Sequence, residues 1–260
     1  MLTTTLSYRL LAKDLQRSLG TVAAEPQVAR ATQYYEEKIA DVKSIDDFFA
    51  DDRLYSYAMK AFGLSEMTFA KAFMRKVLSE GIDSQTSFAN SLSDPRYREI
   101  AAAFNFARYD STTTAFERTR SGTVDRYHRQ TLEENAGREN EGVRLALYFE
   151  RKAKGLGSAL DILADRALLR VVQVALGIPA VSSSAGIDRQ ARAIDSRLDL
   201  NDLKDPQKLD SFLNRFTSLW EIENPAAPPT VPSILLSRPI GLGIGSELLA
   251  SIQNIKFRGR

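Results

Sequence analysis

The chain contains no cysteine among its 260 residues, and His128 is its single histidine. The absence of cysteine excludes disulfide bonds, thiolate nucleophiles and thiolate metal sites. A single histidine excludes a metal site built on a histidine pair, so a catalytic role for His128 would need carboxylate partners alone. Cysteine-free chains suit a reducing cytosol and also export without oxidative folding. The composition therefore leaves the compartment open.

The sequence also lacks a strong excess of charge of either sign and lacks long apolar runs. It has 35 basic and 33 acidic residues, a net charge of +2, and this balance argues against a nucleic-acid partner. Apolar stretches such as 234–236 fall far short of the roughly 20 residues that a membrane-spanning helix needs. Residues 1–11 have neither the apolar core nor the small-residue cleavage site of a secretory signal. We expect no nucleic-acid partner, no transmembrane segment and no cleavable signal peptide.

Helical periodicity is the main pattern that the sequence does contain. Apolar residues recur every three or four positions behind Pro26, a residue suited to the first turn of a helix. Ser44 and Asp47 have the spacing of a capping box at the start of a second helix. Another helix begins at Ser65 and is expected to end at Gly81. Alternating, β-branched strand patterns are nearly absent, so we predict an all-α fold.

An internal repeat organises the chain. A shift of 114 positions superimposes residues 30–64 on residues 144–178 without a gap, with eleven identical pairs among the thirty-five positions. The identical pairs are Arg30/Arg144, Tyr34/Tyr148, Glu36/Glu150, Lys38/Lys152, Ser44/Ser158, Asp47/Asp161, Ala50/Ala164, Asp51/Asp165, Leu54/Leu168, Ala61/Ala175 and Gly63/Gly177. We therefore predict two copies of one multi-helix unit of roughly one hundred residues.

The predicted organisation has four parts. Residues 1–109 form the first helical repeat, 110–122 a linker, and 123–221 a second, diverged repeat. Within the second repeat, residues 124–154 form either one long helix or two. Residues 222–260 are rich in proline at their start and form an extended strap that ends in a short C-terminal helix.

Candidates for chemistry are few, and structural roles explain them better. We interpret His128 as part of a solvated helical surface. Acidic residues at Asp46-Asp47 and Asp51-Asp52 occupy expected first turns of helices, where the helix dipole favours them. The segment Gly241–Gly245 lacks the spacing of a dinucleotide loop and the Lys-Ser/Thr of a phosphate loop. We assign no catalytic, cofactor-binding or metal-binding residue and expect no cofactor.

Two apolar strips at the chain ends are candidates for interaction. The first comprises Leu6, Leu10, Leu11, Leu15 and Leu19, and the second comprises Leu248, Leu249, Ile252 and Ile255. We favour packing of both strips on the body of the protein, with contact between the strips or with a partner as the alternative. Tyr57 and Phe69 fall off the predicted core stripe and are candidates for an interface.

Several segments of the first repeat carry a family resemblance. They are residues 25–30 (EPQVAR), 34–36 (YYE), 44–55 (SIDDFFADDRLY), 57–63 (YAMKAFG) and 88–97 (FANSLSDPRY). The chain resembles an uncharacterised alphaproteobacterial domain-of-unknown-function family, number 1217, which is encoded among flagellar genes. The resemblance implies an association with the flagellum, and it carries over no catalytic residue.

We therefore expect a non-enzymatic, flagellum-associated accessory protein that binds flagellar or flagellar-assembly proteins, located in the cytoplasm or at the flagellum. The alternative is a cytoplasmic regulator of flagellar gene expression or assembly. A third hypothesis is an enzyme that uses Tyr34, Glu36 and Lys38 with their equivalents in the second repeat. Tyr34 and Lys38 would share a helical face from which Glu36 points away, which argues against a common site. The sequence leaves the oligomeric state open.

Overall fold

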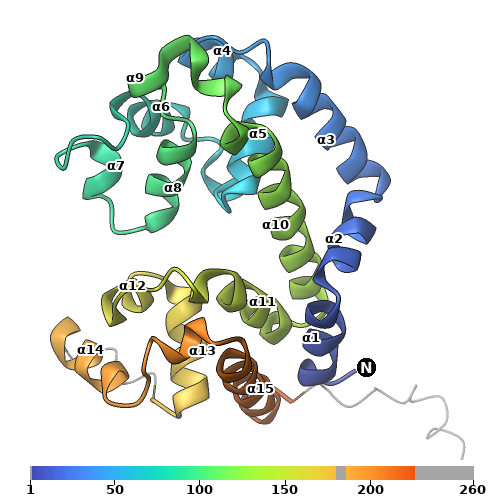
Figure 1. The fold of residues 1–260 in the computed structure, drawn as a ribbon, viewed down its shortest axis with the longest axis vertical. Helices are drawn as coiled ribbons and strands as arrows, with labels where there is room; N and C mark the ends of the chain where they lie inside the picture. The colour runs from blue at the N-terminus through green and yellow to red at the C-terminus, as the bar shows by residue number, and fades with distance from the viewer. Residues whose placement is uncertain (1, 180–185, 226–260) are drawn as a thin grey trace, which may run out of the picture. The chain divides into compact units, whose positions relative to one another are not determined.

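The computed structural model describes residues 2–179 and 186–225, and all regular elements in these ranges are helical (Figure 1). The all-α fold class is confirmed. None of the helices in the described ranges is both long and apolar enough to cross a membrane. The predicted strap beyond residue 225, the segment Gly241–Gly245 and the C-terminal apolar strip lie outside the described residues.

The helices run in the following order. The first part of the chain contains α1 (Thr4–Lys13), α2 (Leu15–Ala23), α3 (Pro26–Ile39), α4 (Ile45–Ala50), α5 (Asp52–Ala61), α6 (Lys71–Glu80), α7 (Phe88–Ser91), α8 (Pro95–Ala103) and α9 (Phe106–Tyr109). The second part contains α10 (Ser121–Glu139), α11 (Glu141–Ala153), α12 (Ala159–Leu163), α13 (Arg166–Leu176), α14 (Ile187–Asp195) and α15 (Pro206–Glu223). Short 3-10 helices cover Ser65–Met67, Asp110–Ala115, Glu117–Thr119 and Asp202–Lys204.

Several of the identical pairs make the same local contacts in both halves of the sequence. Ser44 with Asp47 forms the predicted capping box of α4, and Ser158 with Asp161 forms one at α12. These contacts satisfy backbone N–H groups that a helix start leaves unpaired. The local reason for two of the identical pairs is therefore helix capping. A shared tertiary structure of the two units stays a prediction.

A hydrogen bond between two helices also recurs at the shift of 114. The Tyr34 hydroxyl donates to Asp51 Oδ2 over 2.7 Å, and the Tyr148 hydroxyl donates to Asp165 Oδ2. The other oxygen of each aspartate caps the helix that follows it, α5 or α13. Each aspartate thus joins the start of one helix, α5 or α13, to a tyrosine on the side of an earlier helix, α3 or α11.

Residues 110–122, the predicted linker, form two 3-10 turns and the first residues of α10. Thr113, Thr114 and Thr119 are buried here. The Thr114 hydroxyl donates to the carbonyl oxygen of Val42 over 2.8 Å, and the Tyr35 hydroxyl donates to the carbonyl oxygen of Thr119. The segment therefore packs against α3 and the turn after it.

Residues 124–154 form two helices, because Asn140 ends α10 and caps α11. Its Oδ1 accepts from the backbone N–H groups of Gly142 and Val143. Its side-chain amide donates to Thr4 Oγ1 over 2.9 Å. The break between α10 and α11 is therefore also a contact point for the start of α1.

The N-terminal helix α1 packs against α11 and α15 near the end of the described chain (Figure 1). Thr4 and Tyr8 are its buried residues. The backbone N–H of Thr4 donates to Glu221 Oε2 over 2.7 Å, and Arg9 Nε donates to Asn214 Oδ1 over 2.8 Å. Residues more than two hundred positions apart in sequence thus hold α1 in place.

The N-terminal apolar strip is split by this packing. Leu11, Leu15 and Leu19 lie against the core, as predicted. The prediction is wrong for Leu6 and Leu10, which are 44% and 57% exposed. The reason is that Asp14 ends α1 and caps α2, so the strip does not lie on one continuous helix.

The interface candidates Tyr57 and Phe69 differ in their exposure to solvent. Tyr57 is buried and stacks between Tyr35 and Tyr127, with ring centroids 4.4 Å and 3.8 Å away. The expectation that it belongs to an interface is therefore wrong, because α3 and α10 cover it. Phe69 is 83% exposed, so the structure leaves it accessible to a partner.

Candidate binding cleft

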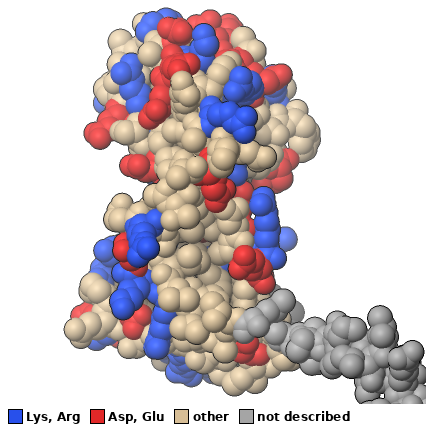
Figure 2. All heavy atoms as spheres, turned by 90° about the vertical axis from the view of Figure 1, so that its right-hand side faces the viewer, with Lys and Arg blue, Asp and Glu red and all other residues tan. Residues whose placement is uncertain are grey.

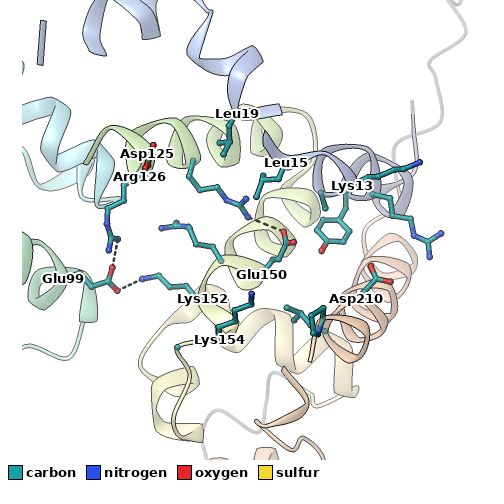
Figure 3. A pocket seen from close by; sticks show the side chains of 18 residues that line it. Lys13, Leu15, Leu19, Glu99, Asp125, Arg126, Glu150, Lys152, Lys154 and Asp210 are labelled. Atoms are coloured by element: carbon teal, nitrogen blue, oxygen red, sulfur yellow. Dashed lines mark hydrogen bonds and ion pairs between the residues drawn. The ribbon is translucent and has the colours of Figure 1, made fainter. Parts of the chain in front are cut away.

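A cleft of about 1050 Å³ lies between α1, α2, α10, α11 and the start of α15, with Glu99 of α8 at its edge (Figure 3). Its apolar lining comes from Tyr8, Ala12, Leu15, Leu19, Pro206 and Leu209. Its charged lining comes from Arg9, Lys13, Glu99, Asp125, Arg126, Arg129, Glu150, Arg151, Lys152, Lys154 and Asp210. The cleft thus combines an apolar surface with a dense set of charges.

Helix starts position the apolar surface. Asp14 accepts from the N–H of Arg17 at the start of α2, which places Leu15 and Leu19 one turn apart on the same side of that helix. Pro206 is the first residue of α15, and Asp205 caps this helix by accepting two backbone N–H bonds. Local sequence therefore fixes two of the helix starts that line the cleft.

A buried ion network lies beneath the charged surface. Glu133 of α10 has a side chain only 2% exposed, and it binds two guanidinium groups. Arg151 Nη2 lies 2.7 Å from Glu133 Oε2, and Arg129 Nε lies 3.2 Å from Glu133 Oε1. Arg129 Nη2 also donates to the carbonyl oxygen of Leu147 over 2.9 Å. The network joins α10 to α11 and holds both arginines in fixed positions.

Glu150 connects this network to the cleft. Its Oε2 accepts from Arg129 Nη2 over 3.4 Å. Burial raises the pKa of Glu150, and the nearby charge of Arg129 only partly reverses that effect. Burial also raises the pKa of the Tyr8 hydroxyl, and the charge of Glu150 adds to that rise. Burial thus favours the neutral form of the Glu150 carboxyl group.

The rim of the cleft carries positive charge that acidic residues do not fully neutralise. Glu99 is shared by two cations, Arg126 at 3.3 Å and Lys152. Lys13 and Lys154 have no acidic partner within the described parts of the chain. The lining holds seven basic and four acidic side chains, and the buried Glu133 offsets one more base. The excess of positive charge lies beside the apolar surface.

The side chains of the cleft are suited to binding. Its lining includes no serine, threonine, cysteine or histidine; its polar groups are those of Tyr8, four acidic residues and seven basic residues. In residues 2–179 and 186–225, no group of three histidine, aspartate or glutamate side chains could hold a metal ion. The arrangement offers fixed cations, a half-buried carboxyl group and an apolar surface.

The residues of the enzyme hypothesis do not form one site. Tyr34 bonds Asp51, and the Arg53 guanidinium lies 3.6 Å above its ring, so the phenol supports α5. Glu36 does not line the shallow pocket that Tyr34 and Lys38 share. In the second repeat, Glu150 and Lys152 line the cleft, while Tyr148 bonds Asp165. Two of the residues named by this hypothesis, Glu150 and Lys152, therefore line the cleft, whereas Tyr148 does not.

His128 lies outside the cleft, between α10 and α3. Its Nε2 is 3.2 Å from Thr32 Oγ1, and the same hydroxyl is 3.0 Å from the Tyr57 hydroxyl. The interpretation of His128 as solvated surface is wrong, because α3 half-buries the ring. Burial lowers the pKa of His128, against the opposing charges of Asp125 and Glu36.

This pKa predicts part of the stability-versus-pH curve. The folded-state pKa lies below the unfolded value of 6.5, so the unfolded chain takes up the proton first. The contribution of His128 is intact above pH 6.5, is lost as pH falls through that value, and levels off below the folded-state pKa. We expect His128→Gln to reduce the loss of stability between pH 7.5 and pH 5, measured by urea unfolding. A pH dependence identical to that of the unaltered chain would contradict this.

The sequence matches the model of a known protein family. The profile of the family described as "Protein of unknown function (DUF1217)" matches residues 61–209, more than half of the sequence. The chain belongs to the DUF1217 family. The predicted family resemblance is thereby confirmed. The DUF1217 match includes α10 and α11, which supply the buried ion network, and α1 precedes it.

A solved structure is similar to this DUF1217 chain over most of its length. It is the crystal structure of protein AGR_C_984 from Agrobacterium tumefaciens, which is 51% identical. The alignment has a TM-score of 0.80 and covers 85% of this chain and 94% of that chain. The comparison with curated proteins gives no match.

Proposed function

We propose that this DUF1217 protein is a non-enzymatic accessory protein of the flagellum that binds another protein through the cleft. The observation that carries the proposal is the cleft itself, in which an apolar surface lies beside uncompensated positive charge. The flagellar setting comes from the family resemblance. The lining contains no serine, threonine, cysteine or histidine, and we take its apolar surface and its excess of positive charge as features of a binding site.

The chemistry of the cleft defines the segment that it would bind. Leu15, Leu19 and Leu209 offer an apolar surface that another protein's side chains can cover. Lys13 and Lys154 offer charge that carboxylates can neutralise. A volume of about 1050 Å³ is at the upper end for small-molecule pockets, which span roughly 300–1,000 Å³. We therefore propose an acidic, amphipathic helix of a flagellar protein as the occupant.

Affinity capture from motile cells tests this proposal. A C-terminal tag is used, crosslinked complexes are analysed by mass spectrometry, and the unaltered chain is compared with the double variant Lys13→Glu/Lys154→Glu. We expect the unaltered chain to capture flagellar proteins and the double variant to recover about tenfold less, because reversed rim charges would repel an acidic segment.

The matched control is Lys43→Glu/Lys76→Glu, which makes the same change of charge at exposed lysines outside the cleft. This control should capture as much as the unaltered chain. Equal losses in the two double variants would contradict a specific role of the cleft. Captured proteins that include no flagellar, rod, hook or export protein would contradict the proposed association with the flagellum. Capture of transcription factors alone would favour the alternative function, a cytoplasmic regulator of flagellar gene expression.

A further inference from the structure

Helix α1 presents an exposed row of leucines on the side that faces away from the protein core. Leu2, Leu6 and Leu10 are 56%, 44% and 57% exposed. Their spacing of four places Leu6 and Leu10 one turn apart, with Leu2 at the same interval just before the helix. The buried residues Thr4 and Tyr8 are two positions out of phase, roughly 200° around the helix axis. We call Leu2, Leu6 and Leu10 the leucine stripe.

A further exposed apolar side chain belongs to α15, the helix against which α1 packs. Ile222, in the last turn of α15, is 75% exposed. The residue before it, Glu221, accepts the N–H of Thr4 at the start of α1. Figure 2 shows an area without charged side chains on the side of the molecule to which α1 belongs, with charged groups on both sides of it. Exposed apolar patches rimmed by charge mark interaction surfaces.

We propose that the leucine stripe binds the same stripe of a second copy, with the two α1 helices antiparallel. The spacing is symmetric about Leu6, as a two-fold interface requires. A two-fold axis at Leu6 brings each Leu6 onto its equivalent and sets Leu2 of one copy against Leu10 of the other. One surface then supplies both halves of the contact without a gap in its apolar row.

The distribution of charge supports this pairing and sets its direction. Arg9 and Lys13 are exposed at the C-terminal end of α1. Glu221 lies at the opposite end of α1, where it accepts the N–H of Thr4 over 2.7 Å. Antiparallel helices bring the basic end of one copy to the acidic end of the other, whereas parallel helices would set like charges together. The charges at the two ends of α1 therefore favour the antiparallel arrangement.

The size of the surface predicts a weak, reversible dimer. One row of leucines and Ile222 would bury less than the ~1,200–2,000 Å² of stable interfaces. We expect the measured mass to rise from 28.9 kDa towards twice that value as the concentration increases. Leu6 and Leu10 do not line the cleft, so variants at these positions test the stripe independently of the proposed function.

Analytical ultracentrifugation over about a hundredfold range of concentration tests self-association. Leu6→Glu would set two carboxylates face to face at the axis, and we expect it to weaken the dimer at least tenfold. Leu160→Glu is the matched control, because Leu160 is 53% exposed on α12, and it should dimerise like the unaltered chain. A monomer at all concentrations, or an undiminished dimer of Leu6→Glu, would overturn the proposal.

Single-cysteine variants test the direction of the helices, since the chain has no cysteine of its own. With oxidised glutathione as the oxidant, Leu6→Cys should form a disulfide-linked dimer. Leu2→Cys and Leu10→Cys should each link poorly alone and well when the two variants are mixed. Efficient linkage of Leu2→Cys or Leu10→Cys alone would show a parallel pair and overturn the antiparallel arrangement.

Discussion

Replacing Glu133 by alanine is expected to destabilise the folded protein by about 3–5 kcal/mol. Glu133 is the one carboxylate that Arg129 and Arg151 share, and its side chain is 2% exposed. Its removal leaves the guanidinium group of Arg151 without its carboxylate partner and that of Arg129 with Glu150 alone, so buried positive charge is no longer balanced. Urea unfolding followed by circular dichroism measures the free energy of unfolding.

The adjacent glutamate provides the control for this variant. Glu134 pairs with Lys60 at 3.1 Å, but its side chain is 31% exposed. Solvent screens such a pair, so Glu134→Ala should cost only about 0–1 kcal/mol. Equal losses of stability in the two variants would contradict the claim that the buried ion network stabilises the fold more than an exposed ion pair does.

Gly142→Ala is expected to destabilise the protein by about 1–3 kcal/mol, although alanine is the better helix former. Gly142 lies in the first turn of α11, where a Cβ atom would be 2.3 Å from Cδ1 of Trp220 and 2.6 Å from its Nε1. The indole ring is rigid, so α11 and α15 would have to separate. Thermal unfolding with Trp220 fluorescence reports both stability and displacement of the ring.

Gly20→Ala is the matched control for this clash. Gly20 is also helical, and a Cβ atom there would meet nothing within 4 Å. The substitution should stabilise the protein by roughly 0.5–1 kcal/mol, because glycine in a helix costs conformational entropy. If Gly142→Ala were as stable as Gly20→Ala, close packing of α11 on α15 would be contradicted.

Local features of the fold could be predicted from the sequence because their causes are local. The capping box of Ser44 and Asp47 and the end of α6 at Gly81 depend on residues within one or two turns. The buried face of α1 could not be predicted in this way. Tyr8 is inside and Leu6 outside because Thr4 and Arg9 bond residues of α15, more than two hundred positions away.

The cleft could not be predicted either, because its charges converge from separate helices. Arg129 and Glu133 are four residues apart, a spacing that also occurs on solvated helix surfaces. Only the packing of α11 against α10 buries Glu133 and brings Arg151 to it. The internal repeat does not predict this environment either. Glu36 and Glu150 are equivalent in the repeat, but Glu36 is exposed and Glu150 contacts Arg129 in the cleft.

The most direct test of cleft binding is photo-crosslinking in motile cells. A photoreactive amino acid replaces Lys154 at the rim of the cleft, and a control carries it at Lys43, outside the cleft. We expect adducts of a flagellar protein from position 154, mapped to an acidic amphipathic segment, and few from position 43. Equal adducts from both positions, or none with a flagellar protein, would contradict the proposal that the cleft binds such a partner.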